Sequence, residues 1–226
     1  MSERSSVFDM IGPVMIGPSS SHTAGVVRIG RVARKILKST PKKAIITFYN
    51  SFARTYEGHG SNRAILGGLL DFHTDDERIK DALILAEQAG LEYHFKSVGN
   101  ASTLHPNTVK IEMTADDGTE ATVVGESRGG GVIRMRSVNG FDTNFTASSH
   151  TLIVYANDQM GSIAFISDVL SHDDCNIATM TVSRKGKNDL ACLVFEMDSG
   201  IKQITLAYIS ELNWVRNVLY IPDIDQ

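Results

Sequence analysis

Residues 12–25 have the sequence GPVMIGPSSSHTAG, and this stretch decides how the first part of the chain folds. Apolar residues follow it at helical spacing: Val26, Val27, Ile29, Val32, Ala33, Ile36 and Leu37. Pro18 fixes one backbone angle, and the serines after it are favoured N-caps. We therefore expect a glycine-proline loop that runs into a helix, which begins within residues 19–23 and ends before Pro41.

The serine-rich loop predicts an anion site. A helix N-terminus leaves its first N–H groups without partners and carries the positive end of the helix dipole. Ser19, Ser20, Ser21 and Thr23 add hydroxyl donors, and His22 adds an imidazole that changes charge near neutral pH. The loop matches neither a Walker A ending nor the dinucleotide fingerprint, so a small carboxylate or a single phosphate is the expected guest. The alternative is a serine-rich cap with no ligand, because a helix needs only one N-cap.

The remainder of this first part has the pattern of an α+β domain. Residues 43–49 form a β-rich run, and residues 64–70 and 75–89 have helical patterns, the first of which contains Gly67 and Gly68. Glycines inside a helix indicate close packing. Strands are expected at 93–98, 107–114, 120–124 and 132–138, joined by short turns that favour antiparallel pairing. We expect helices first and a mostly antiparallel sheet after them.

A short, small and polar segment at residues 146–149 marks a domain boundary, so we expect domains at 1–146 and 147–226. Strand and helix patterns alternate in the second domain over residues 151–156, 161–170, 177–184, 190–197, 201–212 and 215–220. This is the βαββαβ order of ferredoxin-like folds. The predicted fold class of the chain is therefore α+β throughout.

The composition narrows the classes of function. The 226 residues are 42% hydrophobic and 21% charged, which suits one good core or two small ones. A formal net charge of −4 gives no electrostatic case for nucleic acid or an anionic membrane surface. Cys175 and Cys192 are too few for a disulfide framework and lie in no metal-binding pattern, so no metal ligands are expected. Since no signal sequence or apolar run of about 18 residues occurs, we expect a cytoplasmic protein.

Three more motifs carry side chains suited to chemistry. His59 lies between Gly58 and Gly60 at a predicted strand-to-helix junction, and it is the candidate acid or base. His105 and Asn107 flank a proline where a strand is expected to begin. A glycine run at residues 129–131 permits a bulge beside a site. The alternatives are that His59 is an ordinary surface histidine, that residues 105–107 form a plain turn, and that the glycine run forms only a structural bulge.

Taken together and in order, these motifs resemble the β chain of the iron–sulfur L-serine dehydratases. The resemblance covers nearly the whole first domain: the SVFD opening at residues 6–9, the GPSSSHT loop, the Gly-His-Gly step at 58–60, the His-Pro-Asn-Thr step at 105–108 and the serine-glycine run at 127–131. In that family the β chain pairs with an α chain whose cysteines hold a [4Fe–4S] cluster. The two convert L-serine to pyruvate and ammonia, in serine catabolism that feeds gluconeogenesis.

The resemblance implies a lyase subunit and a role for each candidate residue. His59 would take the α-proton of serine, while residues 19–23 would hold the substrate carboxylate. Asn107, and with less support His105, would orient the amino acid. One iron of the partner's cluster would act as a Lewis acid on the serine hydroxyl. The family commonly continues Gly-His-Gly with Thr-Asp, whereas this chain has Ser61-Asn62, so no carboxylate is available at that position.

The second domain resembles an ACT domain, a module that binds amino acids between paired copies. By that match an effector loop would comprise Asn157, Asp158, Gly161, Ser162 and Ile163, and the domain would self-associate. An ACT domain that only dimerises, with an empty loop, is the alternative for this part.

For the whole chain, the alternative is a non-catalytic serine-sensing module that regulates a partner enzyme. A similar domain occurs in some phosphoglycerate dehydrogenases, where it senses serine. His59 with its flanking glycines separates the two hypotheses, because sensing does not need an acid or base.

Overall fold

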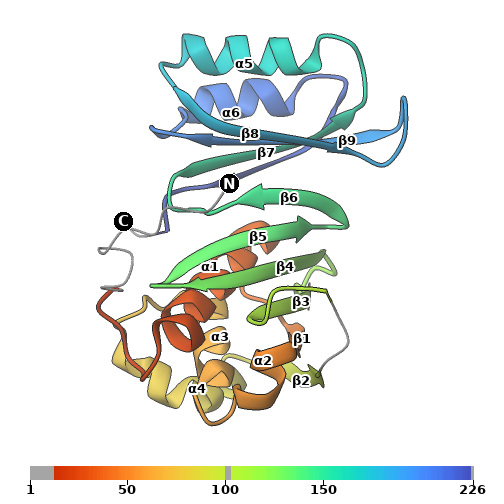
Figure 1. Ribbon diagram of the computed structural model, residues 1–226. Coiled ribbons are helices and arrows are strands. Elements are labelled where there is room, and N and C mark those ends of the chain that lie inside the picture. The colour runs from red at the N-terminus through yellow and green to blue at the C-terminus, as the bar shows by residue number, and fades with distance from the viewer. Residues whose placement is uncertain (1–12, 100–102, 225–226) are drawn as a thin grey trace. The chain divides into compact units, whose positions relative to one another are not determined.

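The computed structural model describes residues 13–99 and 103–224, and Figure 1 labels its helices and strands. The SVFD opening at residues 6–9 lies outside the described residues. The chain divides into two compact units, residues 1–140 and 141–226. The division falls before strand β6 (Phe141–Phe145), whereas the sequence placed it after residue 146.

The opening loop runs into a helix, as predicted. Ser19 is the N-cap: its backbone is extended (φ −144°, ψ 124°), and its side chain accepts a hydrogen bond from the His22 N–H. The first turn, η2 (Ser20–Ala24), is a π-helix, and it continues as α1 (Gly25–Leu37). The π turn was not predicted. The spacing of apolar side chains does not show whether an N–H group bonds to the carbonyl four or five residues before it.

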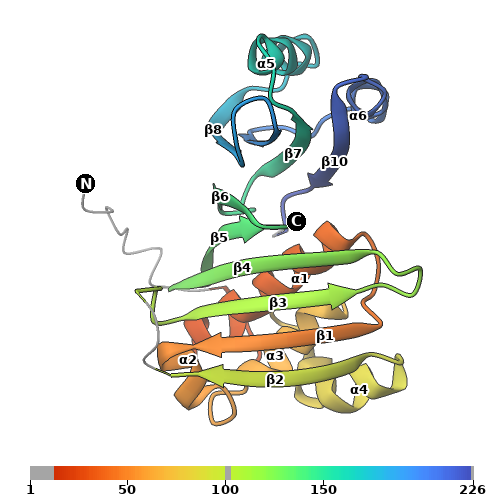
Figure 2. The ribbon, with the colours of Figure 1, turned by 90° about the vertical axis from the view of Figure 1, so that its right-hand side faces the viewer.

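Five strands of the first unit form a mostly antiparallel sheet in the order β2-β1-β3-β4-β5. They are β1 (Lys43–Tyr49), β2 (Glu92–Val98), β3 (Thr108–Thr114), β4 (Glu120–Gly129) and β5 (Val132–Val138). Only the β1–β2 pair is parallel in this set, because helices connect these two strands. The helices cover one face of the sheet, and the other face is turned toward the viewer in Figure 2. The predicted mostly antiparallel sheet is confirmed.

The connecting helices differ in part from the prediction. They are α2 (Asn50–Thr55), α3 (Ser61–Leu69), the 3₁₀-helix η3 (Glu77–Asp81) and α4 (Ala82–Gln88). A single helix over residues 75–89 was wrong, because Asp76 caps a tight 3₁₀ turn by accepting from the Arg78 N–H at 2.9 Å before the α-helix begins. Helix α2 was missed because six residues are too few to show a period.

Two glycines let α1 and α3 come into backbone contact. A Cβ added to Gly30 would lie 2.7 Å from the Ile65 carbonyl oxygen and 2.9 Å from the Gly68 Cα. A Cβ on Gly68 would clash with the Val27 carbonyl oxygen. Because these neighbours are backbone atoms, they cannot move aside as a flexible side chain would. The expectation that glycines inside this helix mark close packing is confirmed.

We expect the substitution Gly68→Ala to lower the free energy of unfolding by about 1–3 kcal/mol, since the methyl group must push two helices apart. Urea unfolding followed by circular dichroism measures the change. The matched control is Gly99→Ala, at an exposed site where an added Cβ meets nothing within 4 Å; its effect should stay within about 0.5 kcal/mol. Equal effects of the two substitutions would contradict the packing argument.

The second unit has the predicted ferredoxin-like fold. Its four-stranded sheet has the antiparallel order β10-β7-β9-β8. The elements are β7 (His150–Asn157), α5 (Ser162–His172), β8 (Ile177–Arg184), β9 (Leu190–Met197), α6 (Gln203–Ser210) and β10 (Val215–Ile221). The first and third strands of the βαββαβ unit therefore lie in the middle, which is the arrangement that the sequence implied.

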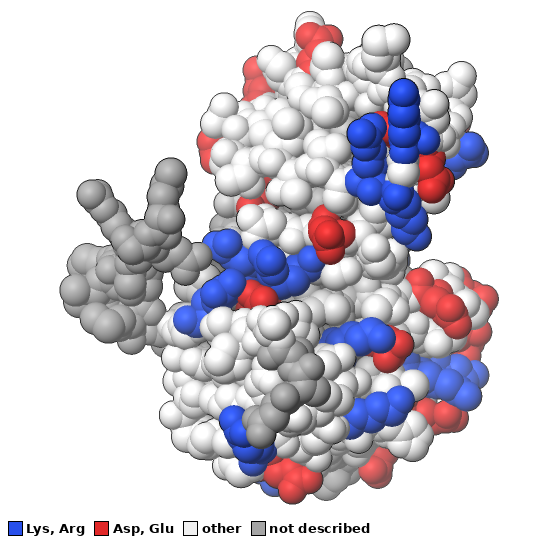
Figure 3. Space-filling view, turned by 45° about the vertical axis from the view of Figure 1, so that its right-hand side comes forward, with Lys and Arg blue, Asp and Glu red and all other residues white. Residues whose placement is uncertain are grey.

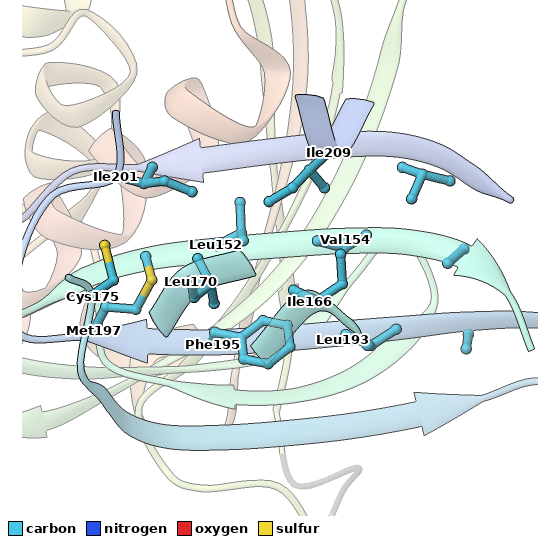
Figure 4. Close-up of a cluster of buried hydrophobic side chains, with 13 residues drawn as sticks. Leu152, Val154, Ile166, Leu170, Cys175, Leu193, Phe195, Met197, Ile201 and Ile209 are labelled. Carbon is cyan, nitrogen blue, oxygen red and sulfur yellow. The ribbon is translucent and has the colours of Figure 1, made fainter. Parts of the chain in front are cut away.

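One apolar cluster holds this second unit together. Leu152 and Val154 of β7 meet Ile166 of α5 and Phe195 of β9, all of them fully buried (Figure 4). Strands β7 and β9 are apolar over almost their whole length because they are central in the sheet. Cys175 belongs to the same cluster, and Cys192 is also buried. The prediction that both cysteines are core or sheet residues is confirmed.

The surface carries charges of both signs. On the face shown in Figure 3, lysine and arginine side chains lie among aspartate and glutamate side chains. Ion pairs such as Lys43–Glu92 and Lys110–Glu112 join opposite charges across and along the strands. Within the described residues, no helix is both long and apolar enough to span a bilayer.

Candidate active site

His22, in the π turn, is held by hydrogen bonds at both ring nitrogens. The Thr55 hydroxyl donates its proton to the Ser51 carbonyl oxygen at 2.9 Å, so its oxygen accepts from His22 Nε2 at 3.1 Å. His22 Nδ1 then accepts from the Ser19 hydroxyl at 3.2 Å. These bonds fit the neutral imidazole with its proton on Nε2.

The rings of His22 and His59 lie together, with centroids 4.6 Å apart and an edge-on angle of 70°. His22 is half-buried and also contacts Phe52 (5.0 Å between centroids), whereas His59 is exposed. Burial lowers the pKa of His22 below its ordinary value, and the neighbouring His59 charge lowers it further. The structure thus pairs a neutral, fixed imidazole with one that solvent or a substrate can reach.

A tight turn positions His59 at the start of α3. The His59 N–H donates to the Thr55 carbonyl oxygen at 3.0 Å, and the Ser61 N–H donates to Tyr56 O at 2.8 Å. Gly60 has a left-handed backbone with φ +71°, although a Cβ there would meet nothing within 4 Å. This backbone angle is what requires a glycine at position 60.

Ser61 joins the two motifs. Its fully buried hydroxyl donates to the His22 carbonyl oxygen at 2.8 Å, which ties the start of α3 to the serine loop. Ser61 thus keeps the hydroxyl of the threonine that the family commonly has at this position, and the hydroxyl joins two segments of the chain. The neighbouring Asn62 uses its side-chain oxygen to accept the Arg63 N–H at 2.9 Å. The amide that stands where the family commonly has a carboxylate therefore bonds within the first turn of α3.

A pocket of about 220 Å³ opens beside His59. It is lined by Ile16, Gly17, Pro18, Thr23, Glu57, Gly58, His59, Gly60, Arg63, Ile79 and Lys80. Thr23 is only 2% exposed, and its hydroxyl has no hydrogen-bond partner among the described residues. A buried hydroxyl without a partner is costly unless a ligand or water satisfies it. The pocket therefore has the size and the polar lining for a small polar molecule.

The glycine run lies beside the serine loop. The Gly130 N–H donates to the Ser20 hydroxyl at 3.2 Å, and a Cβ on Gly129 would lie 3.8 Å from the Ser21 hydroxyl. Ser127 is fully buried next to Gly25, and its hydroxyl has no partner in the described part of the chain. Sequence reasoning noticed this run but left Ser127 out of the candidate site, because a buried, unpaired hydroxyl is visible only in three dimensions.

His105 and Asn107 lie in the turn that precedes β3. The Asn107 N–H donates to His105 Nδ1 at 3.2 Å, and the Phe52 N–H donates to the Pro106 carbonyl oxygen at 3.3 Å. Neither His105 nor Asn107 lines the pocket beside His59. Their predicted role in orienting the substrate stays a prediction.

Comparison with known proteins identifies the family. The family model described as the serine dehydratase beta chain matches residues 6–92. The "Probable L-serine dehydratase, beta chain" of Bacillus subtilis (strain 168) is 46% identical over 96% of this chain and 98% of its own length. This chain belongs to the L-serine dehydratase β-chain family. The "L-serine dehydratase, beta chain" of Peptoniphilus asaccharolyticus is 36% identical, covering 88% of this chain and 89% of that protein.

A solved structure is similar to part of this chain. It is an ACT domain from the GTP pyrophosphokinase of Chlorobium tepidum, and the match covers 31% of this chain and 94% of that structure at 17% identity, with a TM-score of 0.26. The ferredoxin-like fold of the second unit rests on its own strand order.

The residues of this β chain do not suit an iron–sulfur cluster. Thiolates hold such clusters, and both cysteines are buried in the second unit. Burial raises the pKa of Cys192 to about 12 and also raises the pKa of Cys175 above its ordinary value, which disfavours the thiolates. Among the described residues, no group of three His, Cys, Asp or Glu side chains is placed to hold a metal ion.

The loop expected to bind an effector is tied down by its own side chains. Asp158 accepts from the Arg184 guanidinium at 3.0 Å and from the Asn188 N–H at 3.1 Å, while Asn157 Oδ1 accepts from Arg216 at 2.9 Å. Gly161 has φ +84° at the start of α5. The loop's other two predicted residues follow at once: the Ser162 hydroxyl donates to Gln159 O, and Ile163 is partly exposed.

We expect His22 to make the stability of this β chain fall in mild acid. Because the folded-state pKa of His22 lies below the unfolded value of 6.5, the unfolded chain binds the proton more readily, and the free energy of unfolding decreases as pH falls below that value. Urea unfolding at about pH 7.5 and about pH 5.5 should show a larger loss for the wild-type chain than for His22→Gln. Identical losses would contradict this assignment.

Proposed function

We propose that this chain is the β subunit of a heteromeric L-serine ammonia-lyase, which converts L-serine to pyruvate and ammonia. The observation that carries the proposal is the His22–His59 pair beside a small pocket that His59 and Thr23 line. A module that only sensed serine would need the polar pocket but not an exposed imidazole beside it. The membership of the chain in the dehydratase family supports the same reading.

The substrate carboxylate is proposed to bind at the start of the helix that η2 and α1 form. The first-turn amides of Ser20 and Ser21 have no helical carbonyl to pair with, and Thr23 of the same turn lines the pocket. Ser19 and His22 bond to each other, so they support this turn and act on the substrate through it. These donors would hold the α-carbon of serine near His59.

His59 is proposed as the base. It takes the proton from the α-carbon of serine and returns it to the departing β-hydroxyl, which leaves as water; the resulting aminoacrylate tautomerises and hydrolyses to pyruvate and ammonia. Neutral His22 assists because it places no like charge next to the proton that His59 receives. The exposure of His59 lets the substrate reach it.

The [4Fe–4S] cluster is proposed to be held by a separate, cysteine-bearing α subunit. The cysteines of this chain are unsuited to hold it, which is the reason for assigning the ligands to a partner. When bound, such a cluster would supply a Lewis acid for the serine hydroxyl. We further propose that the complex acts in the cytoplasm, in serine catabolism that feeds gluconeogenesis.

The substitution His59→Ala should lower kcat for pyruvate formation by about 10²-fold or more in the anaerobically assembled α–β complex, since a positioned base contributes at least that much. Binding of L-serine should persist. His94→Ala is the matched control, because His94 lies on β2 away from the pocket, and it should keep full activity. Full turnover by the partner subunit alone would refute the proposal; full turnover by His59→Ala would refute only the role of His59.

For the second unit we propose that it binds an amino-acid effector and mediates self-association. The N–H groups at the start of α5, which follow Gly161, suit a carboxylate. The Asn157 N–H bonds to the Trp214 carbonyl oxygen at 2.8 Å, so the single tryptophan of the chain reports on this loop.

Titration of the full chain with L-serine should change Trp214 fluorescence in a saturable way. In Asp158→Ala the change should weaken, because the loop loses its bonds to Arg184 and Asn188. Gel filtration in the presence and absence of L-serine reports any self-association. A flat fluorescence titration up to millimolar serine would count against this ligand for the loop.

A further inference from the structure

We propose that Lys80 is an additional substrate-binding residue of this site, where its ammonium group binds the α-carboxylate of L-serine. The inference rests on the proposed function and adds a source of specificity for the carboxylate. Sequence reasoning did not single out Lys80, because an exposed lysine on a short helical segment looks like any solvated residue. Its place in the wall of the pocket, with Thr23 and His59, is what distinguishes it.

The backbone that carries Lys80 is fixed. Asp76 caps η3, and its carboxylate also receives the Arg78 guanidinium at 2.6–3.1 Å. Ile79 is only 3% exposed, and a Cβ added to Gly67 of α3 would lie 3.1 Å from it. Because Ile79 lines the same pocket, the clamped turn presents Lys80 to the pocket from a defined position.

A full positive charge beside the pocket would stabilise the bound carboxylate, and Lys80 can supply it. The amides at the helix start offer only partial positive charge, whereas a carboxylate that leaves water is better stabilised by a full one. Glu57 also lines the pocket, and its negative charge would repel an anionic substrate. The ammonium group of Lys80 can leave its ion pair with Glu77 to bind the carboxylate. That ion pair is weak, because it spans 3.6 Å between exposed side chains.

Arg78 fits the role less well. Its guanidinium is occupied by Asp76 and lies over the Phe72 ring, 4.2 Å from its centroid. Arg63 also lines the pocket, from the first turn of α3 and next to the buried Ala64, and it is the competing cation that the test separates from Lys80. We assign the carboxylate to Lys80.

The test uses steady-state kinetics of the α–β complex with Lys80→Met, Lys80→Arg and Lys43→Met. Lys80→Met should raise KM for L-serine about tenfold and leave kcat within about twofold, since a charged hydrogen bond to the ground state is lost. Lys80→Arg should restore most of the affinity. Lys43 is the matched control, because it is an exposed lysine on β1 in an ion pair with Glu92; its substitution should change neither constant.

Inhibition by L-serinamide, which lacks the carboxylate, separates binding from a general loss of structure. Its inhibition constant should be the same for the wild-type complex and Lys80→Met. An unchanged KM in Lys80→Met would overturn the assignment, as would a rise in KM produced only by Arg63→Met. If the wild-type complex neither binds nor converts L-serine, the proposed function itself fails and this inference fails with it; the wild-type measurement thus tells the two failures apart.

Discussion

The backbone contact between α1 and α3 is the constraint on which the site depends. The contact is possible only because Gly30 and Gly68 have no side chains. Both helices begin at the site, one after the serine loop and the other directly after Gly60. The spacing of the helices therefore sets the spacing of the loop and His59, and the Ser61–His22 hydrogen bond fastens their two ends. Small displacements of catalytic groups cost rate, so a rigid helix pair suits a site of this kind.

The division of burial between the two imidazoles gives them different roles. Thr55 and Ser19 satisfy both ring nitrogens of His22, and burial keeps its pKa low. His59 has no such enclosure and stands at the pocket. Neutral His22 therefore holds the turn in place and does not repel a positive charge on His59. A fully exposed pair of histidines would lack this difference in burial.

The sequence predicted the regular parts of the fold because strong periodic patterns survive tertiary packing. The ferredoxin-like unit and the mostly antiparallel sheet followed from alternating strands and short turns. The π turn at Ser20–Ala24 and the 3₁₀ turn at Glu77–Asp81 did not follow, because they depend on which backbone group each N–H finds. At the site, motif order pointed to His59 and the serine loop, but the contribution of Thr55 is a contact between separate elements and leaves no local pattern.

The cysteines show how burial changes an argument from composition. Two cysteines are too few for a cluster, yet the count alone would allow one of them to complete a site with a partner. The structure removes that option for the protein as folded, since both thiols are in the core or sheet of the second unit and burial raises the pKa of Cys192 to about 12. The two cysteines of this chain are therefore structural residues of the second unit, and their thiols are poorly suited to act as thiolate ligands.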